Sequence, residues 1–301
     1  MKRFDVVILT DDKHQSREWT DWYYLQVLLE DELVKTALQA QGLSVTRKSW
    51  SDPDFDWSCA DALLFRTTWD YFDRYKEFQP WLERVSKVTQ LLNPKEIIDW
   101  NLHKSYLLDL AQKGVNTVET LLLAQNQDAP LKALMQQHQW QHAIVKPAIS
   151  GAARHTYKVT PENLPQMQQQ LDTLIKDEDF MLQPFQQQIT EFGELSLMVM
   201  GGKVTHAVRK VAKAGDFRVQ DDHGGRVLPH TPASDEIELA EKAIAACNPL
   251  PLYARVDMVK DNQGQWAIME LELIEPELFF RFDNSAAHAL ASAIKLHLHK
   301  K

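Results

Sequence analysis

Cysteine and glycine are scarce in this sequence, with two cysteines (Cys59 and Cys247) and ten glycines in 301 residues. Two cysteines exclude a disulfide-rich scaffold and a cysteine-rich zinc site, so we expect two reduced, buried thiols. No stretch approaches the ~18 apolar residues that a membrane span needs. The apolar run near the N-terminus is too short for a secretory signal and is interrupted by Asp5. We therefore expect a cytoplasmic protein without a membrane partner.

Several motifs of nucleotide-binding and hydrolytic chemistry are also missing. Residues 4–10 form an apolar run that no G-x-G-x-x-G follows, and G-x-x-x-x-G-K-[ST] occurs nowhere, so neither a dinucleotide-binding fold nor a P-loop is supported. The 11 histidines include no H-E-x-x-H spacing, and no serine or cysteine triad is evident. A basic balance is absent too, because 33 Lys+Arg against 42 Asp+Glu give a formal net charge of −9. This balance argues against nucleic acid as a partner.

The composition that is present, 44% hydrophobic and 25% charged, is typical of a globular protein, and the length predicts about two domains. In residues 1–93, short apolar runs alternate with segments of helical periodicity. This order predicts a small parallel α/β domain that ends at Asn93-Pro94. Its expected strands cover residues 4–10, 43–47 and 60–66, and its expected helices cover residues 22–41 and 76–90.

We divide the rest of the chain into a central part, residues 94–186, and a C-terminal part, residues 187–301. The central part is expected to contain helices over 101–112 and 162–175 and strands over 143–147 and 180–184. The C-terminal part is expected to be largely antiparallel, with two hairpins and a terminal helix. Turn residues indicate these hairpins over residues 194–210, around Gly201-Gly202, and 253–274, around residues 261–264.

Acidic side chains concentrate on the second of these hairpins. Alternation along a strand places Arg255 and Asp257 on one face of its first strand. The same rule gives one face of its second strand to Ile268, Glu270, Glu272 and Ile274. Carboxylates gathered in this way are costly to bury unpaired, and Mg²⁺ resolves that cost because it binds carboxylate oxygens together with substrate phosphates. The alternative is an ordinary solvated sheet face.

Basic residues occur singly at places that suit a polyphosphate. Lys104 lies in the expected helix after Asn93-Pro94, and Lys146 ends a strand just before the small-residue loop Ser150-Gly151-Ala152-Ala153. In such a loop, backbone N–H groups approach phosphate oxygens while the ammonium neutralises their charge. Arg209 and Lys210 end the first hairpin. The alternative for each lysine is a solvated surface position.

In this order, these segments resemble the ATP-grasp superfamily from about residue 94 to the C-terminus. Glutathione-synthetase-like ligases are the nearest likeness, and the N-terminal α/β domain looks like the pre-ATP-grasp domain of such enzymes. Three longer segments resemble a subgroup that includes O-ureido-serine cyclo-ligases, namely residues 66–71, 206–210 and 215–220. The matching core segments are residues 100–104, 144–147, 183–185, 193–196, 255–257 and 270–272.

The resemblance implies a role for each matching residue. Lys104 and Lys146 would contact ATP phosphates at the loop of Ser150 and Gly151. The adenine and the ribose would be bound by Gln183, Phe185 and Glu194. One or two Mg²⁺ ions, with Mn²⁺ as an alternative, would be held by Asp257, Glu270 and Glu272. The acyl phosphate, the transferring phosphoryl group or the substrate carboxylate would be stabilised by Arg255, Arg209 and Lys210.

Two residues depart from the usual pattern of the superfamily, in which many members have Asn at the position of Glu272 and more glycine around Gly151. The substrate is expected between the N-terminal domain and the last hairpin. Arg66 and Asp70 follow an expected strand, where α/β proteins usually bind ligands. His223 and Arg281 are further candidates, and structural roles are the alternative for all four.

The implied reaction joins a carboxylate to an amine through an acyl phosphate and releases ADP and phosphate. We expect small amino-acid-like substrates, either as two molecules or as the two ends of one molecule that closes into a ring. Two alternatives stay open: an ATP-binding protein without ligase turnover, and a kinase that stops at a phosphorylated product. A homodimer also stays open.

Overall fold

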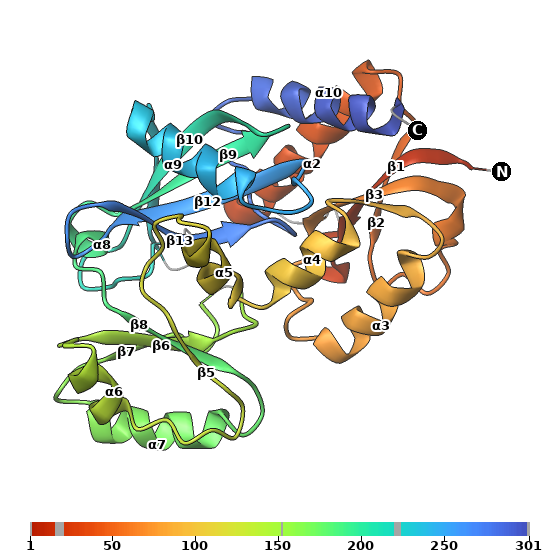
Figure 1. Ribbon diagram of the computed structural model, residues 1–301. Coiled ribbons are helices and arrows are strands. Elements are labelled where there is room, and N and C mark those ends of the chain that lie inside the picture. Colours follow the sequence, from red (N-terminus) through yellow and green to blue (C-terminus); the bar gives the residue numbers. More distant parts are fainter. Residues whose placement is uncertain (1, 16–20, 152, 220–223, 300–301) are drawn as a thin grey trace.

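The protein was analysed as a computed structural model, which describes residues 2–15, 21–151, 153–219 and 224–299. Its strands form three sheets, one from each of the three parts of the chain (Figure 1). The N-terminal sheet and the C-terminal sheet lie together in the upper part of Figure 1, and the central sheet lies below them. Within these described ranges, no helix is both long and apolar enough to cross a membrane.

The N-terminal sheet is parallel throughout, with the order β2-β1-β3-β4. The inner strand β1 (Phe4–Thr10) carries apolar side chains on both faces, because helices cover both faces of the sheet. Val6 and Ile8 of β1 pack toward helices α2 (Trp22–Ala40) and α10 (Ser285–His299), whereas Val7 and Leu9 pack toward α3 (Tyr75–Val85). These elements are β1 (Phe4–Thr10), α1 (Asp12–Gln15), α2 (Trp22–Ala40), β2 (Val45–Ser49), a 3₁₀ turn (Trp57–Cys59), β3 (Ala60–Thr67), α3 (Tyr75–Val85) and β4 (Gln90–Leu92).

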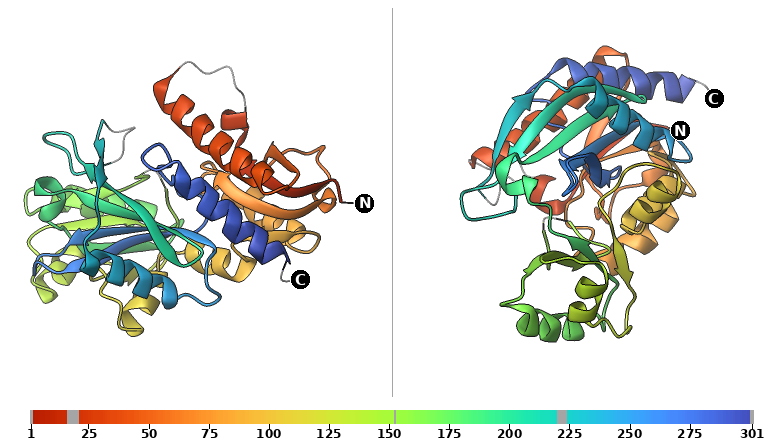
Figure 2. Two further views of the ribbon diagram at one scale, coloured as in Figure 1. Left: turned by 90° about the horizontal axis from the view of Figure 1, so that it is seen from above. Right: turned by 60° about the vertical axis from the view of Figure 1, so that its left-hand side comes forward.

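The terminal helix α10 (Ser285–His299) returns to the first domain. It lies beside α2, as Figure 2 shows, and both helices contribute to one apolar cluster with the N-terminal sheet. Leu290 and Ile294 of α10 are fully buried there. The last residues of the chain therefore stabilise the first ones, and they hold the segment before α10 against the N-terminal domain.

The central part is a four-stranded antiparallel sheet with the order β5-β8-β6-β7. Helices α6 (Leu131–Gln137) and α7 (Leu164–Leu174) cover its lower face in Figure 1. The strands are β5 (Leu121–Leu123), β6 (Ala143–Pro147), β7 (Tyr157–Val159) and β8 (Phe180–Pro184).

The C-terminal sheet has the order β11-β10-β9-β12-β13, and both predicted hairpins are present in it. Helix α9 (Ser234–Ala245) packs on the same face of this sheet as helix α5 (Tyr106–Gln112). The remaining elements are α8 (Gln188–Glu191), β9 (Glu194–Met200), β10 (Lys203–Val211), β11 (Arg226–His230), β12 (Tyr253–Lys260) and β13 (Trp266–Glu272).

Two expected helices differ from the structure. The helix predicted over 101–112 is two helices, α4 (Lys95–Leu102) and α5 (Tyr106–Gln112), and Lys104 lies in the break between them. The break is stabilised from outside, because the backbone N–H of Lys104 donates to the carbonyl of Ala148 at 2.8 Å. The helix predicted over 76–90 ends at Val85, and its last residue begins β4.

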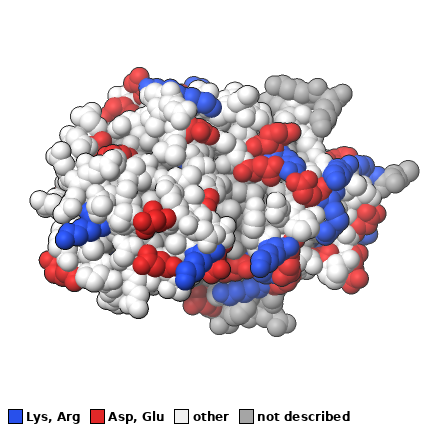
Figure 3. Space-filling view, turned by 60° about the horizontal axis from the view of Figure 1, so that its bottom comes forward, with Lys and Arg blue, Asp and Glu red and all other residues white. Residues whose placement is uncertain are grey.

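The outer surface carries charges of both signs. On the face shown in Figure 3, basic and acidic side chains alternate along one side, and most of the other side is uncharged. Three of the predicted basic site residues, Lys104, Lys210 and Arg255, are buried instead.

Candidate active site

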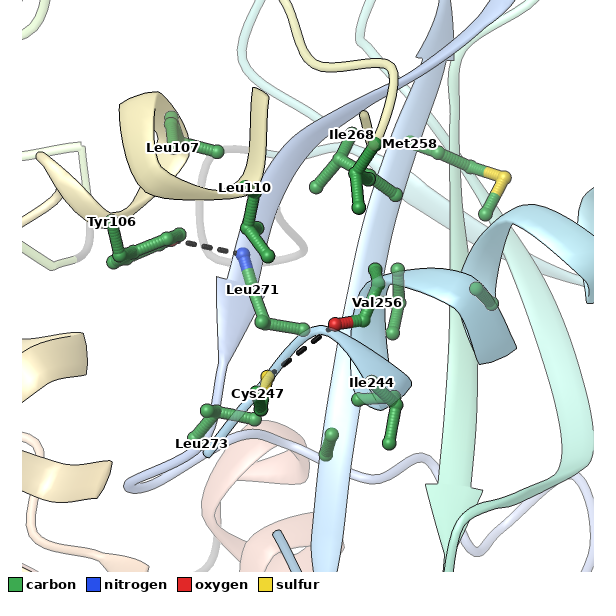
Figure 4. Close-up of a cluster of buried hydrophobic side chains, with 14 of the residues drawn as sticks. Tyr106, Leu107, Leu110, Ile244, Cys247, Val256, Met258, Ile268, Leu271 and Leu273 are labelled. Carbon is green, nitrogen blue, oxygen red and sulfur yellow. Dashed lines mark hydrogen bonds between the residues drawn. The ribbon is translucent and has the colours of Figure 1, made fainter. Parts of the chain in front are cut away.

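The acidic side chains of β13 face a cavity because the residues between them are buried on the opposite side of the sheet. Leu271, between Glu270 and Glu272, packs against α5 and α9 in the core drawn in Figure 4. Its backbone N–H donates to the hydroxyl of Tyr106 at 2.9 Å. Alternation along the strand then directs both neighbouring glutamates away from this core.

A bulge changes the alternation that the sequence predicts further along β13. Asp257 pairs with Glu270, but Met258 pairs with Ile268, so Met269 has no opposite residue. Ile268 therefore packs in the core with Leu271, and Met269 lines the cavity instead. The expectation that Ile268 and Ile274 share the face of the glutamates is therefore wrong. Ile268 points into the core, and Ile274 lies beyond the end of β13, in the core of the first domain.

The cavity has a volume of about 650 Å³ and is bordered by all three parts of the chain. One portion of its wall is apolar, formed by Val118, Ile144, Phe185, Phe217 and Met269. A second portion is charged, formed by Lys104, Lys146, Glu194, Lys210, Arg255, Asp257, Glu270 and Glu272. The third portion comes from the N-terminal domain and is largely aromatic, with His14, Tyr23, Tyr24, Trp69 and Phe72.

Arg255 is the centre of a buried ion-pair network in the charged wall. Its Nε donates to Asp257 Oδ1 at 3.0 Å, and its Nη2 donates both to Asp257 Oδ2, at 2.8 Å, and to Glu272. Lys210 pairs with Glu194 and lies 3.4 Å from Asp257 Oδ2. Each carboxylate of this network thus has a cation beside it, which offsets much of the cost of burying it.

The network separates the pKa values of two neighbouring carboxyl groups. Burial alone would raise the pKa of Asp257, but Arg255 and Lys210 outweigh it and hold that pKa at about 2. Burial raises the pKa of Glu272 to about 7, since the single contact with Arg255 does not compensate and Asp257 and Glu270 repel a second charge. The surrounding cations therefore favour the ionised form of Asp257, whereas burial favours the protonated form of Glu272.

Lys104, in the break between α4 and α5, joins Ser150 to the acidic strand. Its Nζ donates to the carbonyl of Ser150 and lies 2.9 Å from Glu270 Oε1. Burial raises the pKa of Glu270, but Lys104 and Lys146 outweigh it, so that pKa is lowered. Burial lowers the pKa of Lys146, against the opposing effect of Glu270.

Gly151 packs closely against the N-terminal domain. A Cβ atom on Gly151 would lie 2.5 Å from Cε1 of Phe72, too close for any side chain unless the ring moved. The predicted phosphate loop thus rests directly on the N-terminal domain.

The end of β8 is tied to the turn between β12 and β13. Gln183 donates to the hydroxyl of Thr120 at 2.9 Å, and the carbonyl of Phe185 accepts from Asn262 at 3.0 Å. The ring of Phe185 lies 6.0 Å from that of Phe217 and carries the ammonium of Lys158 at 3.6 Å. The two predicted adenine-binding residues, Gln183 and Phe185, both border the cavity.

Not every predicted site residue borders this cavity. Arg209 and Lys210 are neighbours on β10, so their side chains take opposite faces, and Arg209 lies against Phe192, 5.0 Å from its ring centroid. The expectation that both act at one place is corrected accordingly. Arg66 is 1% exposed and pairs with Glu30 inside the first domain. Its position at the end of an expected strand did not show that the side chain turns inward.

The other three candidate substrate residues differ among themselves. Asp70 borders the cavity and accepts from Trp50 Nε1 at 2.7 Å and from Arg74 Nη1 at 2.8 Å. Arg281 does not border the cavity but pairs with Glu277, which does. His223 lies outside the described residues.

Sequence analysis did not identify Asp11 and His14, which border the cavity from the first domain. They follow directly after β1, at the carboxyl edge of a parallel sheet, where ligands of α/β proteins usually bind. That position is the signal that would have found them. Glu275 was also missed, and burial, together with the nearby charge of Glu272, raises its pKa to about 8.

The carboxylates suit a metal ion in kind, although they are paired with cations in this structure. Among the residues that the structure describes, no three His, Cys, Asp or Glu side chains converge as a metal site. Arg255 holds Asp257 and Glu272, and Lys104 holds Glu270. Three carboxylates on one wall are nevertheless the hard oxygen donors that Mg²⁺ selects, so the donor set fits this ion.

Comparison with known families identifies the fold and the class of enzyme. Residues 101–275 match the RimK-like ATP-grasp domain, and residues 6–93 match the N-terminal domain of the D-cycloserine synthetase DcsG. The chain therefore belongs to the RimK-like ATP-grasp family, and the predicted resemblance to the ATP-grasp superfamily is confirmed. It is homologous to ATP-grasp ligases that form carbon–nitrogen bonds.

Individual relatives support this assignment over nearly the whole chain. The cycloserine biosynthesis protein DcsG of Streptomyces lavendulae is 27% identical over 282 residues, which cover 86% of this chain and 90% of that protein. The crystal structure of D-cycloserine synthetase DcsG has a TM-score of 0.87 at 26% identity, covering 97% of this chain and 99% of the other. D-alanyl-alanine synthetase A of Vibrio cholerae shares the fold, with a TM-score of 0.68 at 16% identity and 99% of each chain covered.

Proposed function

We propose that this protein is an ATP- and Mg²⁺-dependent ligase that joins a carboxylate to an amine on small amino-acid-like substrates. The observation that supports this proposal best is the composition of the cavity wall. The apolar, the charged and the aromatic portions of the wall all border one space of about 650 Å³. An adenine, a polyphosphate with its metal ion, and a small substrate need these three surroundings in turn.

The proposed roles follow from the chemistry of each wall. The adenine lies against the apolar wall near Phe185, with Gln183 beside it and Glu194 accepting from the ribose. Lys104 and Lys146 neutralise phosphate oxygens near Ser150 and Gly151. When bound, Mg²⁺ supplies further charge neutralisation to the phosphates, and its ligands are Asp257, Glu270 and Glu272. Arg255 and Lys210 then stabilise negative charge that develops on the acyl group.

In the proposed reaction, an oxygen of the substrate carboxylate attacks the γ-phosphorus of ATP, and the bond to the β-phosphate oxygen breaks. ADP leaves, and an acyl phosphate remains. The amine then displaces phosphate to form an amide. The residues of the chain bind and orient these groups and exclude water, and none of them forms a covalent bond.

Ring closure within one molecule is the first form of the reaction to test. The relative that covers 86% of the chain is named as a cycloserine biosynthesis protein. The crystal structure with the TM-score of 0.87 is that of a D-cycloserine synthetase. A joining of two amino acids is the second form, because D-alanine ligases share the fold. The domain limits at residues 93 and 186 remain part of this proposal.

The test is the release of ADP and phosphate with ATP and Mg²⁺ against separate pools of amino acids, dipeptides, and small hydroxy or ureido acids. Glu270→Ala serves as the blank. Release that depends on one pool supports the ligase, and mass spectrometry of that pool then separates an amide or ring from a stable phosphorylated product. AMP and pyrophosphate in place of ADP and phosphate would contradict the acyl-phosphate route. Tight ATP binding with no release from any pool would contradict ligase turnover on these classes of substrate.

A further inference from the structure

His14 and Asp11 form a buried pair at the aromatic wall of the cavity. His14 is 5% exposed and Asp11 is 3% exposed, and both border the cavity. Nδ1 of His14 lies 2.8 Å from Oδ1 and 2.9 Å from Oδ2 of Asp11, and the backbone N–H of His14 donates to Oδ1 at 2.7 Å. Asp11 thus holds both the backbone and the ring of His14.

This geometry determines which nitrogen of the ring carries the hydrogen. A carboxylate only accepts hydrogen bonds, so a neutral His14 carries its hydrogen on Nδ1 and has a lone pair on Nε2. Tyr24 and Trp69 hold the ring from two sides, with centroid distances of 5.0 Å and 5.3 Å. The carbonyl of His14 also accepts from Nη1 of Arg47 at 2.6 Å. The imidazole is therefore rigidly placed.

Trp69 connects this pair to the acidic strand. The ring of Trp69 packs edge-on against His14. Nε1 of Trp69 donates to the carbonyl of Glu275 at 2.9 Å. Glu275 follows Glu272 by three residues, and both border the same cavity. His14 is thus separated by one side chain from the segment that continues from the proposed metal-binding strand.

We propose that His14 is the base that deprotonates the amine nucleophile, and that Asp11 is its positioning residue. This inference rests on the proposed ligase function. The incoming ammonium has no lone pair, and its N–H bond breaks as Nε2 takes the proton. The freed nitrogen pair forms a bond to the carbonyl carbon of the acyl phosphate, the bond from that carbon to the phosphate oxygen breaks, and phosphate leaves with that electron pair and accepts the second proton. Asp11 stabilises the imidazolium that results.

The test compares two nucleophiles that differ in their need for a base. Hydroxylamine is largely unprotonated at neutral pH and traps acyl phosphates as hydroxamates, whereas amino-acid amines are protonated. With the pool that supports ADP release, we expect His14→Gln to lower formation of the amine product by ~10²–10⁴-fold while hydroxamate formation is unchanged. Asp11→Asn should lower the same step and likewise preserve the hydroxamate.

His138 offers a matched control, because its Nδ1 also lies 2.8 Å from a carboxylate, that of Glu119, but it does not border the cavity. His138→Gln should leave both products unchanged. Equal losses of both products in His14→Gln, or no loss of either, would overturn the assignment. Absence of ADP release and of hydroxamate from the unaltered protein would overturn the proposed function itself, and with it this inference.

A second measurement requires no substrate. Nitrogen NMR of the imidazole groups, with His14→Gln to assign the signal, should show His14 with its hydrogen on Nδ1 and a bare Nε2. A hydrogen on Nε2 in the neutral form would overturn the proposal.

Discussion

Two clusters of carboxylates and cationic side chains are buried in the part of the chain that the structure describes, and one of these two borders the cavity. The cavity cluster consists of Glu194, Lys210, Arg255, Asp257 and Glu272. The N-terminal cluster consists of Glu30, Asp31, Arg47 and Arg66. Both contain short ion pairs at low exposure, so burial and pairing by themselves do not distinguish a site from a structural device.

The two clusters differ in what lies next to their side chains outside the ion pairs. Glu30 accepts from the backbone N–H groups of Leu278, at 2.7 Å, and Phe280, at 3.2 Å, and so ties the segment before α10 to α2. In the cavity cluster, by contrast, side chains border an open space of about 650 Å³. The N-terminal cluster therefore serves the fold, and the cavity cluster has room for a ligand.

The largest effect should come from the charged wall of the cavity. Glu270→Ala removes a proposed metal ligand and should lower Mg²⁺-dependent turnover by at least roughly 10³-fold, a loss typical of removing an electrostatic group from a reaction centre. The thermal midpoint should change little, because Lys104 still donates to the carbonyl of Ser150. Turnover and thermal unfolding are measured on the same samples, and unchanged turnover would contradict the metal assignment.

Arg66→Met should have the opposite profile. Removing this guanidinium leaves the ionised form of Glu30 buried without its cation, so above about pH 7, where that form is populated, the free energy of unfolding should fall by about 3–5 kcal/mol. Urea unfolding measures this loss. Adding Glu30→Gln should recover part of it, since the uncompensated charge is then gone. If Arg66→Met instead reduces turnover while stability is unchanged, Arg66 belongs to the site after all and the two clusters are not distinct.

The N-terminal cluster should also make stability depend on pH. Burial raises the pKa of Glu30 to about 7 from the ordinary 4.5, although Arg66 opposes the shift. The folded state therefore binds this proton more tightly, and the contribution to stability is fully present below about pH 4.5 and is lost as the pH rises through about 7. Relative to Glu30→Gln, the unaltered protein should lose up to roughly 3 kcal/mol over that interval. Parallel curves of unfolding free energy against pH for the two proteins would disprove this.

The smallest effect should come from the side chain that links the two regions. Trp69→Phe removes the hydrogen bond to the carbonyl of Glu275 and should cost about 1 kcal/mol of stability. Because Trp69 borders the cavity, the KM for the substrate should rise more than kcat falls. Chemical unfolding and steady-state kinetics check the two expectations, and a fall in kcat at constant KM would show a different role.

Regular patterns in the sequence were sufficient for most of the framework. Alternation and turn residues predict both hairpins, and the short apolar runs predict the parallel sheet, because both signals depend only on neighbouring residues. The same alternation places Asp257, Glu270 and Glu272 together, and all three border the cavity.

Predictions failed where a distant contact decides the local geometry. The bulge on β13 moves Ile268 into the core, and a hydrogen bond to Ala148 holds the break that contains Lys104. Neither Ala148 nor the pairing of Met258 is marked by any local pattern. Arg209 could have been separated from Lys210, since adjacent residues on a strand take opposite faces.

The sequence by itself determined the family, the order of the elements and the residues that carry the charge, because these depend on composition, periodicity and motif order. Only the tertiary structure decided which of those charges share a space. Arg66 and Arg255 follow equally plausible strand patterns, yet one is enclosed by α2 and the segment before α10, and the other opens onto a cavity. The physical reason is that the enclosure of the N-terminal cluster results from contacts between segments more than a hundred residues apart, which no local pattern records.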